Sequence, residues 1–380
     1  MITKLTKLFT EFFESERTGG FLLMGAAALA VVLANSAVSE SFLHFWHTEL
    51  PGGNLEFWIN DGLMAVFFLL VGLEIERELY IGELSDRSNA MLPVAAAVGG
   101  MLLPAGIYFA FNAGLPTQNG FGVPMATDIA FALGVLSLIG NRVPVSIKVF
   151  LTALAIIDDL GAILVIAIFY SDSFSWWWLG ISAAIFGVMI LLNRFKIKNL
   201  TPYLLLGAAL WYTIHHAGIH ATIAGVLTAF AIPFGDGGER SPSYVLQHFL
   251  HKPVAFFIMP VFALANAGLV LESGWTQSFG APVGLGILFG LLLGKPAGVL
   301  LGVWLSRRFA GDESAKNATW MHYFGAGLLA GVGFTMSIFI TLLAFETPDE
   351  ITTAKTAIFA ASLLAGVAGY VVMKLAPSRE

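Results

Sequence analysis

The chain has 380 residues, of which 57% are hydrophobic and only 12% are charged. Because soluble globular chains are about one quarter charged, this composition argues against a soluble protein and indicates one that lies in lipid. The net charge of −6 says little by itself, but the absence of cysteine excludes disulfides, thiolate metal sites and thiol nucleophiles.

Apolar runs of spanning length recur along the whole chain, with turn-forming or charged residues between them. Since a membrane-spanning helix needs about 20 mostly apolar residues, we predict an all-α polytopic membrane protein with about 12 transmembrane helices. The pair within 201–233 is short for two spans. The predicted spans cover residues 18–35, 57–80, 90–112, 120–140, 145–170, 176–193, 201–216, 218–233, 253–271, 282–306, 320–345 and 354–375.

Lysine and arginine fall almost entirely in the loops on one side of these spans. Examples are Arg142 and Lys148 after the fourth span and Arg307 and Arg308 after the tenth, whereas the opposite loops offer only Lys355. Because such residues are retained in the cytoplasm, and because the number of spans is even, both termini are predicted to be cytoplasmic. No change in composition marks a soluble domain, so residues 1–380 are predicted to form a single integral membrane transport domain. The polar segment 234–252 is predicted to be a linker with an amphipathic entry to the ninth span.

Two of the predicted spans contain residues that interrupt a helix. The fourth, GFGVPMATDIAFALGVL, has Pro124 and Asp128 in a glycine-rich segment. Proline removes a helical hydrogen bond, and Thr127 and Asp128 can bond the freed backbone groups. The eleventh, FGAGLLAGVGFTMSIFI, has four glycines near its centre, although these can also be positions of close helix packing. We therefore expect two broken, crossing helices.

The order of these spans suggests an internal repeat. In each half of the chain, one span precedes the breakable span and one follows it. The third to fifth spans and the tenth to twelfth spans thus form three-span units near 90–170 and 282–375. Because the units lie seven spans apart, they would have opposite orientations. Inverted repeats with broken helices are the plan of many secondary transporters.

Charged residues occur in the middle of predicted spans. Asp158 and Asp159 interrupt an otherwise apolar run that, as a helix over 145–170, is roughly 39 Å long, more than the ~30 Å hydrocarbon core. Each such charge costs roughly 2.5–3.5 kcal/mol. Carboxylates are hard oxygen ligands for a small cation and can also hold protons, which favours competition between the two. Asp128 and Lys295 have the type and depth to compensate the ends of broken helices. Purely structural roles for the pair, Asp128 or Lys295 stay open.

Several segments resemble the signature motifs of the bacterial NhaA-type sodium/proton antiporters. These segments are ATDIAFALGVL, LAIIDDLGAI, LGKPAGV, GVGFTMSIFI, NDGLMAVFFLLVGLEIERE and GIHATIAGV. The resemblance covers nearly the whole chain. It implies that Asp158 and Asp159 bind the cation and carry protons, and that Thr127 lies beside the helix crossing. It also implies that Asp128 and Lys295 serve the broken helices and that Lys295 can pair with Asp158.

The resemblance further implies a pH-responsive group at the cytoplasmic funnel. It comprises Glu74 and Arg77 together with the 247–252 region, which contains His248 and His251. Gln247 stands where the family pattern leads us to expect an acidic residue, so the acid end of the pH response is in doubt. From the residues alone, His248 and His251 are also compatible with a solvated helix face.

Histidines elsewhere suggest one alternative site. His216 and His220 lie four residues apart, a spacing seen in zinc sites, but Gly218 lies between them and no HExxH pattern is present. A helix-end or pH-responsive role for His220 is favoured, because histidine titrates near neutral pH.

We expect an antiporter of the bacterial inner membrane that exports sodium, and also lithium, in exchange for protons. It is expected to be electrogenic and pH-regulated, to be no enzyme, and to need no cofactor. Membrane lipid is the expected surrounding, nucleic acid is not an expected partner, and a homodimer is one option for the oligomeric state. The nearest alternative is a sodium-coupled symporter of a small organic solute. A channel is disfavoured by paired titratable groups, and an intramembrane aspartyl protease by the absence of a GxGD-type context.

Overall fold

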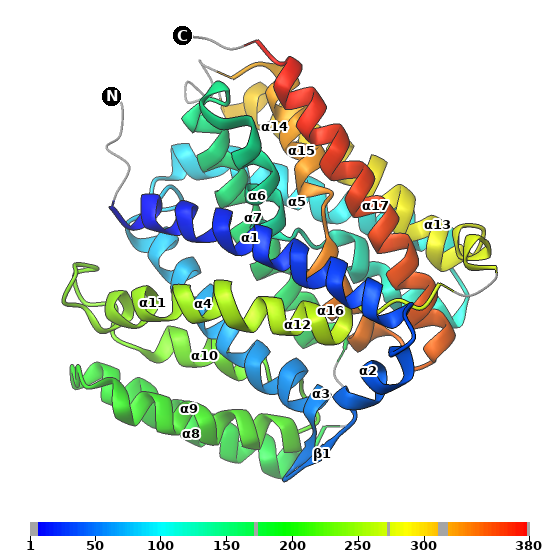
Figure 1. The fold of residues 1–380 in the computed structure, drawn as a ribbon. Helices are drawn as coiled ribbons and strands as arrows, with labels where there is room; N and C mark the ends of the chain where they lie inside the picture. Colours follow the sequence, from blue (N-terminus) through cyan, green and yellow to red (C-terminus); the bar gives the residue numbers. More distant parts are fainter. Residues whose placement is uncertain (1–6, 171–173, 272–273, 311–317, 378–380) are drawn as a thin grey trace.

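The computed structural model describes residues 7–170, 174–271, 274–310 and 318–377, and it is almost entirely helical (Figure 1). The first half contains the helices α1 (Lys7–Ala34), α2 (Ser39–Trp46), α3 (Leu55–Phe57), α4 (Met64–Tyr80), α5 (Arg87–Asn112), α6 (Ile129–Ile139), α7 (Val145–Phe169) and α8 (Trp176–Arg194). The second half contains α9 (Leu200–His216), α10 (Ile223–Ala231), α11 (Pro242–Pro253), α12 (Met259–Asn266), α13 (Pro282–Phe289), α14 (Lys295–Ala310), α15 (Trp320–Ala330), α16 (Phe334–Ala344) and α17 (Pro348–Leu375).

Shorter elements complete the description. Two antiparallel strands, β1 (Glu49–Leu50) and β2 (Gly53–Asn54), form a small hairpin. Three π turns interrupt longer helices, namely η1 (Trp58–Leu63), η4 (Val254–Ile258) and η6 (Gly290–Gly294). Three 3₁₀ segments are η2 (Pro116–Met125), η3 (Gly140–Arg142) and η5 (Trp275–Phe279).

The chain is an all-α polytopic membrane protein, as its composition predicts. In the described residues, eight helical segments are long and apolar enough to cross a membrane, and the bent pair α15 and α16 makes up to nine. Of the other predicted spans, the apolar part of α1, residues 18–34, is shorter than this length criterion, and α9 has 17 residues. The predicted span 218–233 contains only the nine residues of α10, because Gly218, with φ of +81°, ends the preceding helix in a turn.

The predicted linker 234–252 is only partly a linker. Helix α11 begins at Pro242 and leads through η4 into α12, so this helical segment starts eleven residues before the predicted ninth span. Ser241 explains the start, because its side chain accepts a hydrogen bond from the Tyr244 N–H and Pro242 occupies the first helical turn.

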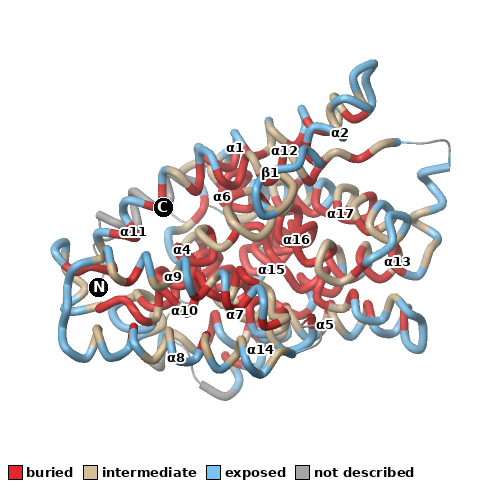
Figure 2. Tube along the Cα trace, turned by 90° about the horizontal axis from the view of Figure 1, so that it is seen from below, coloured by how far each residue is buried: buried red, intermediate tan, exposed pale blue. Residues whose placement is uncertain are grey.

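Buried residues gather in the centre of the molecule, on α6, α7, α15 and α16 (Figure 2). In the segment 116–139, 78% of the most apolar stretch is buried, whereas the corresponding value for the peripheral helix α8 is 11%. The predicted breakable span thus lies in the protein interior, where irregular backbone is tolerated because lipid does not reach it.

Helices α5 and α14 pack so closely that their backbones touch. A Cβ atom on Gly99 would collide with the Gly298 carbonyl, and one on Gly298 would collide with the Gly99 carbonyl. Small residues allow such close approach of membrane helices. Because α14 begins at Lys295, this contact also fixes where that lysine enters the interior.

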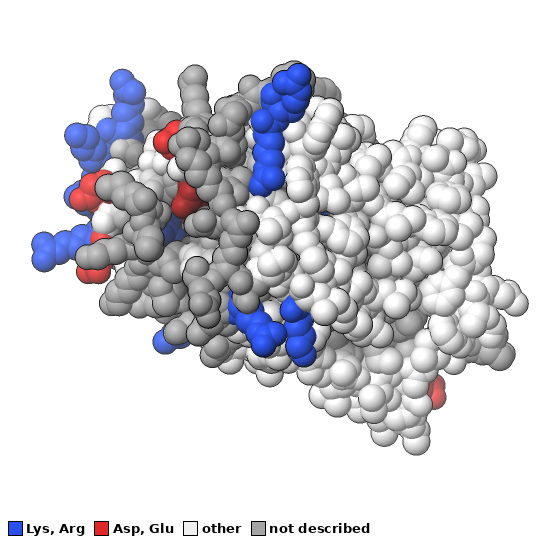
Figure 3. All heavy atoms as spheres, turned by 90° about the horizontal axis from the view of Figure 1, so that it is seen from above, with Lys and Arg blue, Asp and Glu red and all other residues white. Residues whose placement is uncertain are grey.

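Charge is distributed unevenly over the surface. On the face shown in Figure 3, lysine and arginine gather at one end, whereas the other end is almost free of charged side chains. Helix α1 begins and α17 ends on the same side of the molecule (Figure 1).

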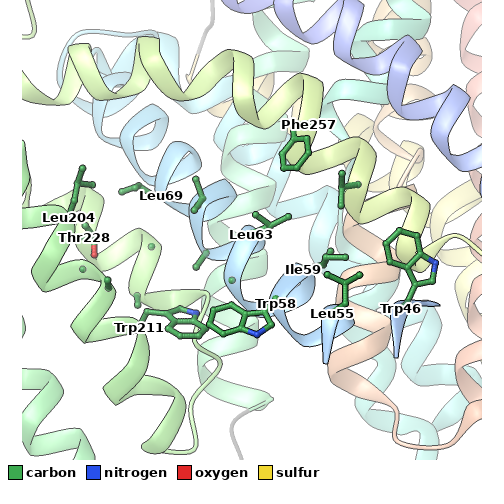
Figure 4. Close-up of a pocket in the computed structure, with 18 of the residues that line it drawn as sticks. Trp46, Leu55, Trp58, Ile59, Leu63, Leu69, Leu204, Trp211, Thr228 and Phe257 are labelled. Atoms are coloured by element: carbon green, nitrogen blue, oxygen red, sulfur yellow. The ribbon is translucent and has the colours of Figure 1, made fainter. Parts of the chain in front are cut away.

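An apolar pocket of about 730 Å³ lies between α4, α9 and α10 (Figure 4). Its lining includes Trp58 and Trp211, whose stacked rings have centroids 5.7 Å apart. None of the predicted site residues belongs to this lining, so the candidate chemistry lies elsewhere.

Candidate functional site

Helix α7 carries the two adjacent aspartates into the centre of the protein. It begins after Pro144, whose fixed backbone angle suits a helix start, and continues through an apolar sequence to Phe169. Asp158 and Asp159 are 1% and 3% exposed. Their carboxylates are therefore removed from lipid and from bulk water, and neighbouring groups must offset the cost.

Lys295 provides the largest compensation for Asp158. Its ammonium nitrogen donates a hydrogen bond to Asp158 Oδ2 at 2.6 Å, and both side chains are fully buried. The same nitrogen donates to the main-chain carbonyl of Met125, the last residue of η2. The lysine therefore bonds the Asp158 carboxylate and a free helix end at once, which are the two contacts expected for it.

Thr127 is the third group at this point. Its hydroxyl lies 2.7 Å from Asp158 Oδ2 and 2.9 Å from the carbonyl oxygen of Ala330, the last residue of α15. Because a hydroxyl has a single proton, Thr127 donates to one of these acceptors at a time. The Asp158 carboxylate and the carbonyl at the end of α15 therefore compete for the Thr127 hydroxyl proton.

The backbone departs from helical structure at one place in the fourth predicted span and at one place in the eleventh. Residues 126–128 connect η2 to α6 without helical structure, and residues 331–333 connect α15 to α16, which are bent by 45°. Such breaks leave N–H and C=O groups unbonded within the helix and place partial charges at the new ends.

Asp128 bonds the N-termini of both inner half-helices. Its Oδ1 accepts from the Phe131 N–H at 2.9 Å, which caps α6. Its Oδ2 accepts from the N–H of Thr335 at 3.1 Å and from the Thr335 hydroxyl at 2.5 Å, at the start of α16. The Asp128 N–H in turn donates to the Val332 carbonyl at 2.7 Å. One carboxylate therefore compensates two positive helix ends, which favours helix-end compensation as its role.

Three polar residues of the crossing were missed by the sequence reading. Thr335 bonds Asp128, Ser337 donates to the Val123 carbonyl at 2.7 Å, and Ser362 accepts from the Phe334 N–H at 3.1 Å. Thr335 and Ser337 lie in the quoted glycine-rich segment, where hydroxyl residues in a breakable span are a usable signal. Ser362 lies inside the apolar helix α17 and gives no comparable signal.

A small cavity reaches this cluster. It has a volume of about 30 Å³, and its polar lining consists of Glu74, Asp128 and Asp159. A cavity must hold roughly 10–15 Å³ to admit one water molecule, so this one admits a species of that size. Asp158 Oδ1 is also buried and accepts no hydrogen bond from the described residues. Both aspartates therefore offer oxygen atoms suited to a small cation.

The predicted pH-responsive residues divide into two locations. The Glu74 carboxylate lies 3.5 Å from His251 Nδ1, and Arg77 is close enough to interact electrostatically with that histidine. His248 is exposed and stacks on Tyr244. His220 lies apart from them, in the turn before α10, near Asp61.

The interpretation of His248 and His251 as a solvated face is wrong for His251. Its side chain is 5% exposed, because α11 packs this side against α4, and only His248 faces outward. Gln247 is buried on the same helix, at 2% exposure. His216 is exposed, with Nδ1 at 2.9 Å from the Tyr212 carbonyl. Within the part of the chain that the structure describes, His216 and His220 belong to no group of three metal-ligating side chains.

The chain is similar to known proteins over nearly its whole length. A family model described as Na⁺/H⁺ antiporter 1 matches residues 10–373. A protein of Flavobacterium psychrophilum named Na(+)/H(+) antiporter NhaA is 54% identical over 371 residues, which cover 98% of this chain and 97% of that protein. Proteins of the same name from Dechloromonas aromatica and Vibrio parahaemolyticus are 54% and 46% identical, each over 97% of this chain, and over 96% and 97% of their own lengths. The match extends over nearly the whole chain, and the chain therefore belongs to the Na⁺/H⁺ antiporter 1 family.

Proposed function

We propose that the protein is a secondary antiporter that exports sodium in exchange for protons. The observation that carries this proposal is the buried cluster of Asp158, Asp159 and Lys295 beside a water-sized cavity. Carboxylate oxygens suit a small hard cation, and the same atoms accept protons, so one site can serve both ions in turn. The relatives that match nearly the full length of this chain are named sodium/proton antiporters, which supports the same activity.

The contacts suggest the order of events at the site. Asp158 is bonded by Lys295 and Thr127, whereas Asp159 lines the cavity together with Glu74. Sodium would therefore meet Asp159 first and then displace the lysine ammonium from Asp158. The displaced lysine and the protonated Asp159 release their protons, and the reverse sequence on the other side of the membrane reloads them.

The proton count follows from these charges. With Asp159 protonated and Lys295 paired to Asp158, the cluster is neutral. With sodium bound to both carboxylates and a neutral lysine, its charge is −1, so one sodium replaces two protons. The exchange would then move one net charge in each cycle, and it is electrogenic.

We further propose the architecture expected from the sequence for alternating access. It comprises about 12 spans in one domain, with inverted three-span units near 90–170 and 282–375 and two broken helices that cross. The interruptions at 126–128 and 331–333 and the reciprocal contact of Gly99 with Gly298 support this plan. The gathering of lysine and arginine at one end supports cytoplasmic termini in a bacterial inner membrane (Figure 3).

pH regulation is proposed to involve the buried contact of Glu74 with His251, together with Arg77, His248 and His220. Lithium is proposed as a second substrate, because it is also a small hard cation. No resident cofactor and no enzymatic activity are proposed, since the ions are the cargo. Sodium-coupled symport of an organic solute has less support, because the cavity at the aspartates measures about 30 Å³, far below the roughly 300–1,000 Å³ of small-molecule pockets, and the 730 Å³ pocket contains none of the predicted site residues.

Replacing either member of the aspartate pair tests the site. Asp158→Asn and Asp159→Asn should each abolish sodium-driven proton exchange in proteoliposomes while leaving expression largely intact, because an amide neither holds the proton nor supplies the charge. Asp236→Asn, at an exposed loop position, is the matched control and should exchange normally. Parent-like turnover in either of the first two variants would remove the pair from the mechanism.

Loss of the buried lysine should destabilise the protein. Lys295→Ala leaves the buried Asp158 without its cation, and breaking a buried pair in this way costs about 3–5 kcal/mol. We expect a clearly lower melting temperature, with Lys295→Arg retaining more stability because it keeps the charge. Lys252→Ala removes an exposed lysine and should melt like the parent protein. An unchanged melting temperature for Lys295→Ala would show that the ion pair does not stabilise the fold.

The charge count predicts that voltage drives the exchange. A net charge crossing the membrane gains about 2.3 kcal/mol per 100 mV. Sodium uptake into proteoliposomes should therefore be accelerated by an interior-positive potential, set with a potassium gradient and ionophore in the absence of a pH gradient. Uptake that does not respond to the potential would contradict two protons per sodium.

The identity of residue 247 should influence the activity–pH profile. Gln247 lies one helical turn before His251, so Gln247→Glu places a carboxylate beside a histidine that also interacts with Glu74, Arg77 and His248. The added negative charge favours the protonated form of His251. If activation follows the loss of this proton, it should therefore move to higher pH. The profile is measured by exchange assays between about pH 5 and 9, which includes the interval of about pH 5 to 8 in which an unperturbed histidine titrates. A profile that superimposes on the parent's would rule out this position.

A further inference from the structure

The lysine of the cluster follows directly after a π turn. At the end of η6, the N–H of Lys295 donates to the carbonyl of Gly290, five residues earlier. In a continuous α-helix it would donate to the carbonyl of Leu291, four residues earlier. A π turn closes on the fifth residue, so it places the following side chains on a different side of the helix than a continuous α-helix would. One additional residue corresponds to a rotation of about 100°. The direction of the Lys295 side chain therefore depends on this turn.

Pro296 gives a physical reason for the π turn. An α-helical turn would require the N–H of residue 296 to donate to the carbonyl of Leu292, but proline has no N–H and its ring clashes with that carbonyl. The wider turn relieves the clash. Gly327 of α15 lies against Pro296, since a Cβ on residue 327 would come within 2.9 Å of the Pro296 Cα. The proline is thus held from one side by the broken span.

The segments before and after the turn are both attached to α5. Gly286 of α13 lies against Tyr108 and Asn112, and Gly298 of α14 contacts the backbone of Gly99. The lysine stem itself runs past Gly100, where a Cβ would lie 3.7 Å from Lys295 Cδ and Cε. Because α13 and α14 are both packed against α5, the turn between them determines the direction in which the Lys295 side chain points.

We propose that Pro296 is a positioning residue for transport. By maintaining the π turn it directs the Lys295 ammonium onto Asp158 and so sets how strongly this lysine competes with sodium. The inference rests on the proposed sodium/proton exchange and extends it to a residue that touches neither ion.

The chain contains its own control for this arrangement. The π turn η4 is followed by Met259 and then Pro260, and the Met259 N–H donates to the Val254 carbonyl, again five residues earlier. The geometry and the position of the proline match those of η6, but an uncharged methionine takes the place of the lysine. Pro260→Ala therefore reports the general effect of restoring an N–H after a π turn.

The test compares the apparent sodium KM and kcat of Pro296→Ala, Pro296→Ser and Pro260→Ala with those of the parent, at the pH of half-maximal parent activity. Alanine and serine both restore the N–H, so the turn can relax and Lys295 holds Asp158 less firmly. KM for sodium should fall by roughly threefold to tenfold in both Pro296 variants, with a smaller change in kcat. Because Met259 lines the small cavity, Pro260→Ala can change KM without acting on the lysine, and any such change should persist when Lys295→Gln is added.

A double-mutant cycle decides whether Pro296 acts through the lysine. Sodium affinity is measured from the sodium-dependent rise in melting temperature, which requires no turnover. Adding Pro296→Ala to Lys295→Gln should leave this affinity unchanged, because the group being positioned is gone.

Three results would overturn the inference: an unchanged KM in the Pro296 variants, the same fold-change in the Lys295→Gln background, or failure of both Pro296 variants to fold while Pro260→Ala folds. If the parent itself shows no sodium-driven exchange, it is the proposed function that fails.

Discussion

The contact between Lys295 and Asp158 is the interaction on which the centre of this protein depends. Removing a carboxylate and an ammonium from water costs several kcal/mol for each ion, and the cost is offset only by close pairing and further hydrogen bonds. Both are present, with an N–O distance of 2.6 Å and additional bonds from Thr127 to the carboxylate and from the ammonium to the Met125 carbonyl. In the proposed mechanism sodium replaces the lysine at this carboxylate, so the same contact would serve both stability and exchange.

The broken helices supply the rest of the local environment. Asp128 accepts hydrogen bonds at the N-termini of α6 and α16, and Thr127 lies within hydrogen-bond distance of the end of α15. The two interruptions also bond each other, since the Asp128 N–H donates to the Val332 carbonyl, the Thr335 N–H donates to Asp128, and the Thr127 hydroxyl lies 2.9 Å from the Ala330 carbonyl oxygen. Movement of Lys295 away from Asp158 would also change the bonding at Met125, so the proposed ion binding would be coupled to the backbone at the end of η2.

Much of this site could be predicted from the sequence because single residues there contradict their surroundings. Asp158, Asp159 and Lys295 are charges in apolar runs, and Pro124 and the glycines of 325–333 weaken helices that composition alone would make continuous. The cluster as a whole was predicted less completely. The contacts of Thr335 and Ser362 depend on which helices meet, and that is decided by long-range packing. The burial of His251 and the early start of α11 were missed for the same reason, since polar residues conceal a helix that packs against α4.

The central claim is that sodium and protons compete for one buried cluster. It is tested most directly by adding sodium to the purified protein in weakly buffered solution and measuring the protons released as sodium binds. The account predicts that protons appear in proportion to bound sodium, approaching two for each sodium ion, and that Asp158→Asn and Asp159→Asn abolish the release. Sodium binding to saturation with no change in pH would contradict it.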